Sequence, residues 1–321
     1  MLDLIAMTAS PVASLLLLGV IGFYVLQRRI VPEVALGAIS PLALELALPA
    51  LIFTKIITRF DPVKSASWYQ MPLWWVGFTV GSLALALALP ALLRTRSPRE
   101  FRMSLFIQNG IFLPLIYLSD VYGADSPRLL DLFFFTMFYP AFSFNVYGLF
   151  FSRPGGRDLG KLLHPVLFAT ALAVGGAYLG LSELLPAFVL SSLTMLGATS
   201  VPLVMIAVGG SIYLDFRQSG VVRWGELVRF VLAKNVLYPA AALGLVALTH
   251  PPAAVGLMIV LQSAVPPLTA LPIFAERAGG DRALVAQYLL ASFLATIVTL
   301  PATMLAYQLW VAPGGLGPSG G

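Results

Sequence analysis

Long apolar stretches dominate this chain and constrain its fold more than any other feature of the sequence. Windows of about 20 apolar residues, bounded by charged or turn-forming residues, recur along the whole length. A helix of that length can cross a bilayer, because it satisfies its own backbone hydrogen bonds without water. We therefore expect ten transmembrane helices, near residues 10–27, 34–58, 72–93, 101–119, 130–151, 162–181, 187–213, 227–248, 253–274 and 284–310.

The composition agrees with an all-α polytopic membrane protein. Of the 321 residues, 59% are hydrophobic and 10% are charged, whereas soluble domains carry about 25% charged residues. So much apolar surface cannot be buried in a water-soluble core of this length. The chain has no cysteine and two histidines far apart, so we expect neither a disulfide, nor a metal site, nor another cofactor.

The positive charges are distributed unevenly between the expected loops. Most of the 19 Lys and Arg residues follow the first, third, fifth, seventh and ninth spans, and few lie on the other side (Arg59, Lys64 and Arg128). Because cytoplasmic loops are enriched in Lys and Arg, both termini are predicted to lie outside. The basic balance therefore indicates topology, and we expect no nucleic-acid partner because no basic soluble domain is present.

The two halves of the chain resemble each other weakly. Pro49 aligns with Pro202, and Gln108 aligns with Gln262, at nearly the same offset. Each half holds five expected spans, so the second half must enter the membrane from the opposite side. We expect an inverted repeat, with a first repeat at 1–152, a cytoplasmic linker at 153–161, a second repeat at 162–310 and a disordered Gly/Pro-rich tail at 311–321.

The fourth and ninth spans are counterparts in this repeat, and both are interrupted. A proline inside a helix costs about 3 kcal/mol or more, and in a membrane the freed backbone groups are tolerated only inside protein or beside a wet cavity. Two matched broken helices are the best sequence pointer to a transporter's binding site, because half-helix N-termini attract anions. The residues concerned are Gln108, Asn109, Gly110, Pro114, Gln262, Ser263, Pro266, Pro267 and Thr269.

These stretches resemble the auxin efflux carrier family, which includes plant PIN-FORMED carriers and bacterial malonate and malate permease-like proteins, within the bile acid/arsenite/riboflavin transporter superfamily. The resemblance rests on LALPALIF, QNGIFLPLIYLSDVYG, LGATSVPLVMIAVGGSI and LQSAVPPLTALPIFAERAGGDRAL, and covers essentially the whole chain. It implies scaffold and transport subdomains, an elevator-type cycle, and crossing of the two broken helices at Pro114 and Pro266. It also implies that polar groups beside the crossing, Asn109 among them, receive an organic anion.

Two charged residues within expected spans are candidates for proton coupling. Glu45 is expected to be buried in the middle of the second span, where a charge is costly. Lys234 lies within the eighth span. Alternatively, these residues serve the structure, with Glu45 paired to Lys234 or to a backbone donor, and Lys234 paired to Glu45 or Asp215.

Three further residues carry weaker predictions. Asn145 in the fifth span either reaches the crossing or makes an interhelical hydrogen bond. Lys55, near the end of the second span, either attracts an anion or extends to the membrane interface. Thr58 follows Lys55 and could offer its hydroxyl to the binding cavity.

The function expected from the sequence is secondary transport of a small organic anion, a mono- or dicarboxylate of the malonate, malate or auxin type, either proton-coupled or uncoupled. The alternatives are sodium-coupled symport, a passive channel, and a sensor that keeps the transporter fold without transport. No Walker motif, nucleotide loop, catalytic dyad or metal cluster is apparent, so an ATP-driven pump or an enzyme is not expected. We expect a bacterial-type plasma (inner) membrane as the location, and the anion, the lipid bilayer and a second copy of the chain as partners.

Overall fold

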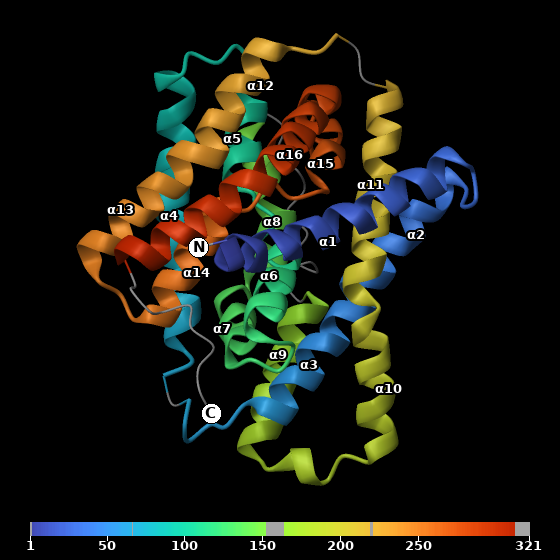
Figure 1. Ribbon diagram of the computed structural model, residues 1–321. Helices are drawn as coiled ribbons and strands as arrows, with labels where there is room; N and C mark the ends of the chain where they lie inside the picture. The colour runs from blue at the N-terminus through green and yellow to red at the C-terminus, as the bar shows by residue number, and fades with distance from the viewer. Residues whose placement is uncertain (1, 66, 152–163, 219–220, 312–321) are drawn as a thin grey trace.

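The computed structural model of the protein describes residues 2–65, 67–151, 164–218 and 221–311 (Figure 1). These residues are helical throughout, apart from loops and one isolated β-bridge, and the helices cover the same apolar stretches that the sequence predicts. Five helical segments are long and apolar enough to cross a membrane: Glu33–Arg59, Gln70–Leu92, Ala187–Leu214, Trp224–Thr249 and Arg282–Val311. A multi-pass helical membrane protein is thus confirmed, and the count of ten spans stays a prediction. The predicted linker at 153–161 and nearly all of the predicted tail lie outside the described residues.

The helical elements of the first half are α1 (Leu2–Gln27), η1 (Glu33–Ala35), α2 (Leu36–Pro41), η2 (Leu42–Ala47), α3 (Leu48–Arg59), α4 (Gln70–Leu92), α5 (Pro98–Phe106), α6 (Phe112–Tyr122), α7 (Pro127–Phe135), α8 (Tyr139–Val146) and η3 (Tyr147–Phe150). Those of the second half are α9 (Pro165–Tyr178), η5 (Leu181–Glu183), α10 (Ala187–Ala198), α11 (Ser200–Gln218), α12 (Trp224–Val231), η6 (Leu232–Leu237), α13 (Tyr238–Thr249), α14 (Ala253–Ala264), α15 (Leu271–Arg277), α16 (Arg282–Ala306) and η7 (Tyr307–Val311).

The helices pack in two groups. In the first group α1 lies along α11, and α3 packs against α9 and α10. In the second group α4 packs on α5, α13 on α14, and α16 on α12, α14 and α15. Figure 1 places α10 and α11 along one edge of the molecule, α4, α12 and α13 along the other, and the short helices α6, α7 and α8 between them. Of the halves of the broken spans, α6 thus lies between the groups, and α5, α14 and α15 belong to the second group.

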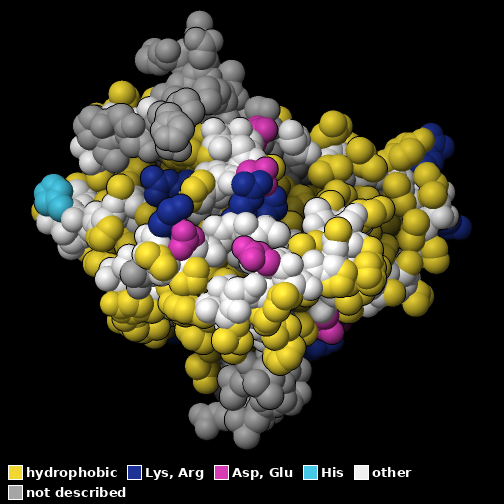
Figure 2. Space-filling model, turned by 90° about the horizontal axis from the view of Figure 1, so that it is seen from below, with side chains coloured by type: hydrophobic (Ala, Val, Ile, Leu, Met, Phe, Trp, Pro, Cys, Tyr) yellow, Lys and Arg dark blue, Asp and Glu magenta, His cyan; other side chains and the backbone are white. Residues whose placement is uncertain are grey.

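The outer surface is apolar, as a lipid environment requires. On α4, for example, Leu73, Val80 and Leu87 are exposed. Figure 2 shows one end of the molecule, where charged side chains gather near the middle of the face and hydrophobic side chains surround them. This distribution matches a protein whose sides contact hydrocarbon and whose ends contact water.

Two long helices contain a wider, π-helical turn directly before a proline. The π-helical segment η2 ends two residues before Pro49, and η6 ends two residues before Pro239. A proline ring clashes with the carbonyl group four residues earlier, and a wider turn relieves that clash without ending the helix. The carbonyl groups concerned belong to Glu45 and Asn235, so both prolines change the backbone at polar residues.

The fifth expected span is broken, which the sequence analysis did not predict. We expected one helix over 130–151, but α7 ends at Phe135 and α8 begins at Tyr139. Pro140 has no N–H to donate to the Thr136 carbonyl group. Instead the Tyr139 N–H donates to the Thr136 carbonyl at 2.9 Å, which closes a tight turn between the two short helices.

A close backbone approach holds α10 against α3. A methyl group added at Gly197 would lie 2.7 Å from Cα of Leu51, which is backbone and cannot move aside easily. Glycine at this position therefore sets the spacing of two helices in the first group.

We expect Gly197→Val to destabilise the protein by about 1–3 kcal/mol, because the added side chain must push α10 away from α3. The measurement is the melting temperature of the purified protein in detergent, followed by tryptophan fluorescence. Gly77→Val is the matched control, since a methyl group at Gly77 meets no atom within 4 Å. Equal melting temperatures for the two variants would contradict the expectation.

Candidate functional site

The two interrupted segments pair with each other through their backbones. Residues 107–111 connect α5 to α6, and residues 265–270 connect α14 to α15. The Asn109 N–H donates to the Pro266 carbonyl at 2.8 Å, and the Leu268 N–H donates to the Ile107 carbonyl at 3.0 Å, on either side of an antiparallel bridge between Gln108 and Pro267. The two helix breaks thus satisfy part of each other's backbone.

Side chains reinforce this crossing. The Gln262 side-chain amide donates to the Gly110 carbonyl at 2.6 Å, and the Gln108 amide lies 3.4 Å from the Gln262 side-chain oxygen. Tyr139 donates its hydroxyl to the Gln108 carbonyl. A methyl group at Gly110 would lie 2.8 Å from the Gln262 side-chain oxygen, so glycine keeps room for that amide. The side chains of Gln108 and Gln262 therefore stabilise the crossing itself.

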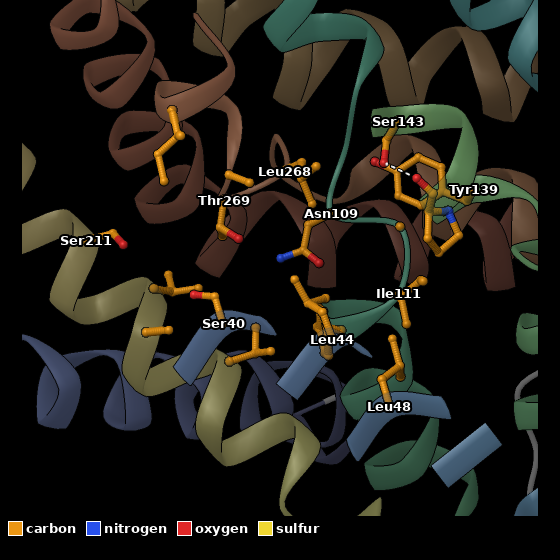
Figure 3. Close-up of a pocket in the computed structure, with 18 of the residues that line it drawn as sticks. Ser40, Leu44, Leu48, Asn109, Ile111, Tyr139, Ser143, Ser211, Leu268 and Thr269 are labelled. Atoms are coloured by element: carbon orange, nitrogen blue, oxygen red, sulfur yellow. Dashed lines mark hydrogen bonds between the residues drawn. The ribbon is translucent and has the colours of Figure 1, made fainter. Parts of the chain in front are cut away.

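Asn109 projects from the crossing into a cavity of about 120 Å³, which we call the Asn109 cavity. Only 1% of Asn109 is exposed, yet neither atom of its side-chain amide has a hydrogen-bond partner. Figure 3 shows Asn109 and Thr269 pointing into the cavity, with Ser40, Leu44 and Leu48 facing them from α2, η2 and α3. A buried amide without partners is costly, and a bound molecule that contacts it would remove that cost.

The walls of the Asn109 cavity are mostly apolar. Leu44, Leu48, Val204 and Val208 come from the first group of helices, opposite the crossing. No Lys, Arg, Asp or Glu lines the cavity among the residues that the structure describes. The remaining polar groups at its walls are Ser40, Tyr139, Ser143, His164 and Ser211.

The start of α6 also faces the cavity. Ile111 and Phe112, which cap and begin this helix, both line it. The first N–H groups of a helix have no partner within that helix, and they carry a partial positive charge. The Asn109 cavity therefore combines an unpartnered amide with a positive helix end, which is the chemistry of an anion site.

A second cavity, of about 390 Å³, lies along the same interface; we call it the Lys55 cavity. Three helices line both cavities at positions three residues apart: Leu48 and Leu51 on α3, Phe112 and Leu115 on α6, and Val204 and Val201 on α11. Such pairs are about one helical turn apart, or roughly 5 Å along the axis. One apolar layer thus separates the Asn109 cavity, which lies at the crossing, from the Lys55 cavity.

The structure brings the residues of the broken spans together but divides them by role. Asn109, Gly110 and Thr269 line the Asn109 cavity, and Gln108, Gln262, Pro266 and Pro267 build the crossing. The hydroxyl of Ser263 is buried and donates within its own helix, to the Val260 carbonyl at 2.6 Å.

The expected crossing at Pro114 is corrected by the structure. Pro114 is buried in the first turn of α6, where a missing N–H costs little. It is residues 107–109 that meet Pro266 and Pro267. The local reason is that the chain is extended at Ile107, directly before the bridge residue Gln108, whereas Pro114 already belongs to a helix.

Two other predicted residues lie outside both cavities. Asn145 donates to the Ala141 carbonyl at 2.7 Å, within its own helix, so it makes neither the cavity contact nor the interhelical bond that the sequence suggested. Thr58 is exposed and donates to the Thr54 carbonyl at 2.6 Å.

The two proton-coupling candidates differ sharply. Glu45 is exposed on the outside of η2, so the expectation that it is buried is wrong, and no pairing with Lys234 is observed among the described contacts. Lys234 is fully buried, with Nζ 3.5 Å from the Ser263 carbonyl and 4.3 Å from the ring centre of Tyr238. The side chain of Asp215, the other suggested partner, lies outside the described residues. Lys234 therefore remains as a buried basic residue beside the C-terminal end of α14, which leads into the crossing.

Sequence reasoning missed the wall opposite the crossing and the contribution of α8. Ser40 and Ser211 come from helices that carry no polar cluster, and a lone serine in an apolar span is not a signal by itself. Tyr139 could have been found from its neighbour Pro140, which marks the break between α7 and α8.

A comparison with protein families finds one match that covers nearly the whole chain. A family model described as "Membrane transport protein" matches residues 7–161 and residues 158–304. No curated protein matches the sequence.

Two substitutions at the crossing should differ in their effect on stability: the first should lower it, and the second should not. Gln262→Ala leaves the buried Gly110 carbonyl without its donor and should cost about 1–3 kcal/mol. Asn109→Ala removes an amide that has no partner, so we expect the melting temperature to stay the same or rise. Thermal unfolding of both purified variants in detergent checks this, and a large loss of stability in Asn109→Ala would contradict the assignment of Asn109 to ligand binding.

Proposed function

The chain belongs to the membrane transport protein family, the auxin efflux carrier family to which the sequence bears a resemblance, and from this premise we propose that it is a secondary carrier of a small organic anion with one carboxylate group. The observation that carries the proposal is the unpartnered amide of Asn109 in an apolar cavity at the start of α6.

The proposed ligand is an anion because the cavity offers donors and a positive helix end. The Asn109 amide can donate to a carboxylate oxygen, and the first N–H groups of α6 are available beside it. No carboxylate lines the cavity among the described residues, so nothing there repels a negative charge. Thr269 adds a hydroxyl that can donate on the same side.

One carboxylate with an apolar body fits this cavity better than two carboxylates. The walls facing Asn109 are formed by Leu44, Leu48, Val204 and Val208, which suit a hydrocarbon or aromatic group. A second carboxylate would lie against these side chains without a cationic partner, which is unfavourable. Among the expected substrates, the arrangement therefore favours an auxin-like monocarboxylate over malonate or malate.

Alternating access is the transport mode that we propose. The two cavities lie between the same three helices, and one apolar layer separates them. Movement of the crossing relative to α3 and α11 by about the length of one helical turn would expose Asn109 to the other side. The backbone pairing of residues 107–109 with 266–268 supports movement of both broken helices as one body, as in an elevator cycle.

Proton coupling through Lys234 is the mode of energisation that we propose, with sodium coupling as the alternative. Lys234 is buried and places its ammonium group near the carbonyl end of α14, 3.5 Å from the Ser263 oxygen. Carbonyl groups at a helix C-terminus attract a cation. A protonated Lys234 is attracted to these carbonyl groups, and its charge repels a sodium ion from the same position.

Asn109→Ala should abolish saturable uptake of a monocarboxylate, because it removes the proposed carboxylate donor. The measurement is uptake into proteoliposomes of indole-3-acetate, malonate, malate and succinate, with and without proton and sodium gradients. Asn145→Ala is the matched control and should retain uptake, since its amide bonds within its own helix. Uptake that survives in Asn109→Ala would contradict the assignment of Asn109 to the binding site. If the wild-type protein takes up none of the four acids, the result would favour a sensor.

Lys234→Met should remove the dependence of uptake on a proton gradient, because it replaces the proposed proton carrier with an apolar side chain of similar length. Glu45→Gln should leave that dependence unchanged, since Glu45 is exposed and contacts neither cavity. Uptake measured at several imposed pH gradients checks both variants. An intact gradient dependence in Lys234→Met would contradict the role of Lys234.

A further inference from the structure

The Lys55 cavity is lined by one cation, Lys55, among the residues that the structure describes. Lys55 is 24% exposed, and its Nζ lies 2.8 Å from the Ala124 carbonyl and 3.0 Å from Oδ1 of Asp125. Both partners belong to the loop between α6 and α7, whereas Lys55 belongs to α3. The ion pair therefore joins α3 of the first group to the loop between α6 and α7, beside the cavity.

The Asp125 carboxylate, which pairs with Lys55, is easily replaced by another carboxylate. Asp125 is 63% exposed, and exposed ion pairs contribute little to stability. Its other oxygen lies 3.0 Å from the Arg59 guanidinium. The hydrogen bond from Lys55 and the charges of Lys55 and Arg59 lower the pKa of Asp125, so this group stays ionised near neutral pH. An external carboxylate could take its place on Lys55 while Asp125 stays on Arg59.

The cavity wall also holds a buried polar group with no partner. Ser200 is completely buried, lines the cavity, and its hydroxyl makes no hydrogen bond. Buried hydroxyl groups are usually bonded, so an unpartnered one in a cavity wall points to a ligand or to water. Ser14, Ser119 and Thr194 are further polar residues that line the same cavity.

We propose that the Lys55 cavity is a second carboxylate site, in which the anion replaces Asp125 on Lys55 before or after it occupies the Asn109 cavity. This inference rests on the proposed carrier function for the identity of the anion. The exchange also weakens the attachment of the α6–α7 loop to α3, because Asp125 then keeps only its contact with Arg59. Asp120 lines the same cavity and disfavours a dianion.

The absence of cysteine from the sequence permits a direct test on the full chain. Thr194→Cys places a single thiol in the cavity wall, and its modification by an anionic and a cationic methanethiosulfonate reagent is timed in detergent. The ratio of the two rates reports the local charge. In this background Lys55→Gln should lower the anion-to-cation ratio about fivefold, because it removes a positive charge from the wall that Thr194 shares, and Asp125→Asn should raise the ratio, because it removes the negative charge paired with Lys55.

The matched control is Lys64→Gln, which removes an exposed lysine outside the cavity and should leave the ratio unchanged. Acetate serves as the carboxylate probe, compared with chloride at equal ionic strength. Acetate should slow the anionic reagent more than chloride does, and this difference should vanish in Lys55→Gln.

Equal ratios in Lys55→Gln and Lys64→Gln, or an acetate effect that persists without Lys55, would overturn the second site. Neither outcome depends on transport. The carrier function is tested separately by uptake into proteoliposomes, so the failure of one proposal is distinguishable from the failure of the other.

Discussion

The structure depends on one constraint: backbone N–H and C=O groups inside an apolar medium must find partners within the protein. Breaking two helices at the same place would be prohibitive if each break had to be satisfied alone. Here the breaks satisfy each other, through the bonds of Asn109 to Pro266 and of Leu268 to Ile107. The Gln262 amide adds a further bond to the Gly110 carbonyl. Once the backbone is satisfied in this way, the Asn109 side chain is free to serve a ligand.

Much of this arrangement could be predicted from the sequence, because prolines and amides in an apolar span are rare enough to be informative. The two broken spans and the contact between them follow from Gln108, Gln262 and the prolines. The division of labour among these residues could not be predicted, since Asn109 and Gln108 are chemically alike and differ only in what surrounds them. The same limit applies to Glu45, whose exposure depends on which face of η2 is turned outward. Ser40 and Ser211 were missed because the wall opposite the crossing consists of common residues on ordinary helices.

The prolines have three different effects in this chain, depending on their local setting. Pro266 and Pro267 end a helix and begin an extended segment. Pro49 and Pro239 leave their helices continuous and only widen the preceding turn. Pro140 shortens a span into two helices and thereby places Tyr139 against the Gln108 carbonyl. Sequence alone does not separate these outcomes, because each depends on whether a neighbouring group can donate a hydrogen bond to the carbonyl that the proline leaves free.

The pairing at the crossing also sets an order of events during biosynthesis. Gly110 and Gln262 are separated by 152 residues along the chain. At a synthesis rate of about 5–20 residues per second, the partner of the first break is made roughly 8–30 s after the break itself. Through that interval the Ile107 and Gly110 carbonyl groups lack their final donors, Leu268 and Gln262, and the half-finished protein must hold them near water or near the insertion machinery. Synthesis of the second half therefore supplies the last hydrogen-bond donors for the first break. A ribosome that stalls between the two halves leaves a broken helix in the membrane with carbonyl groups that have no partner.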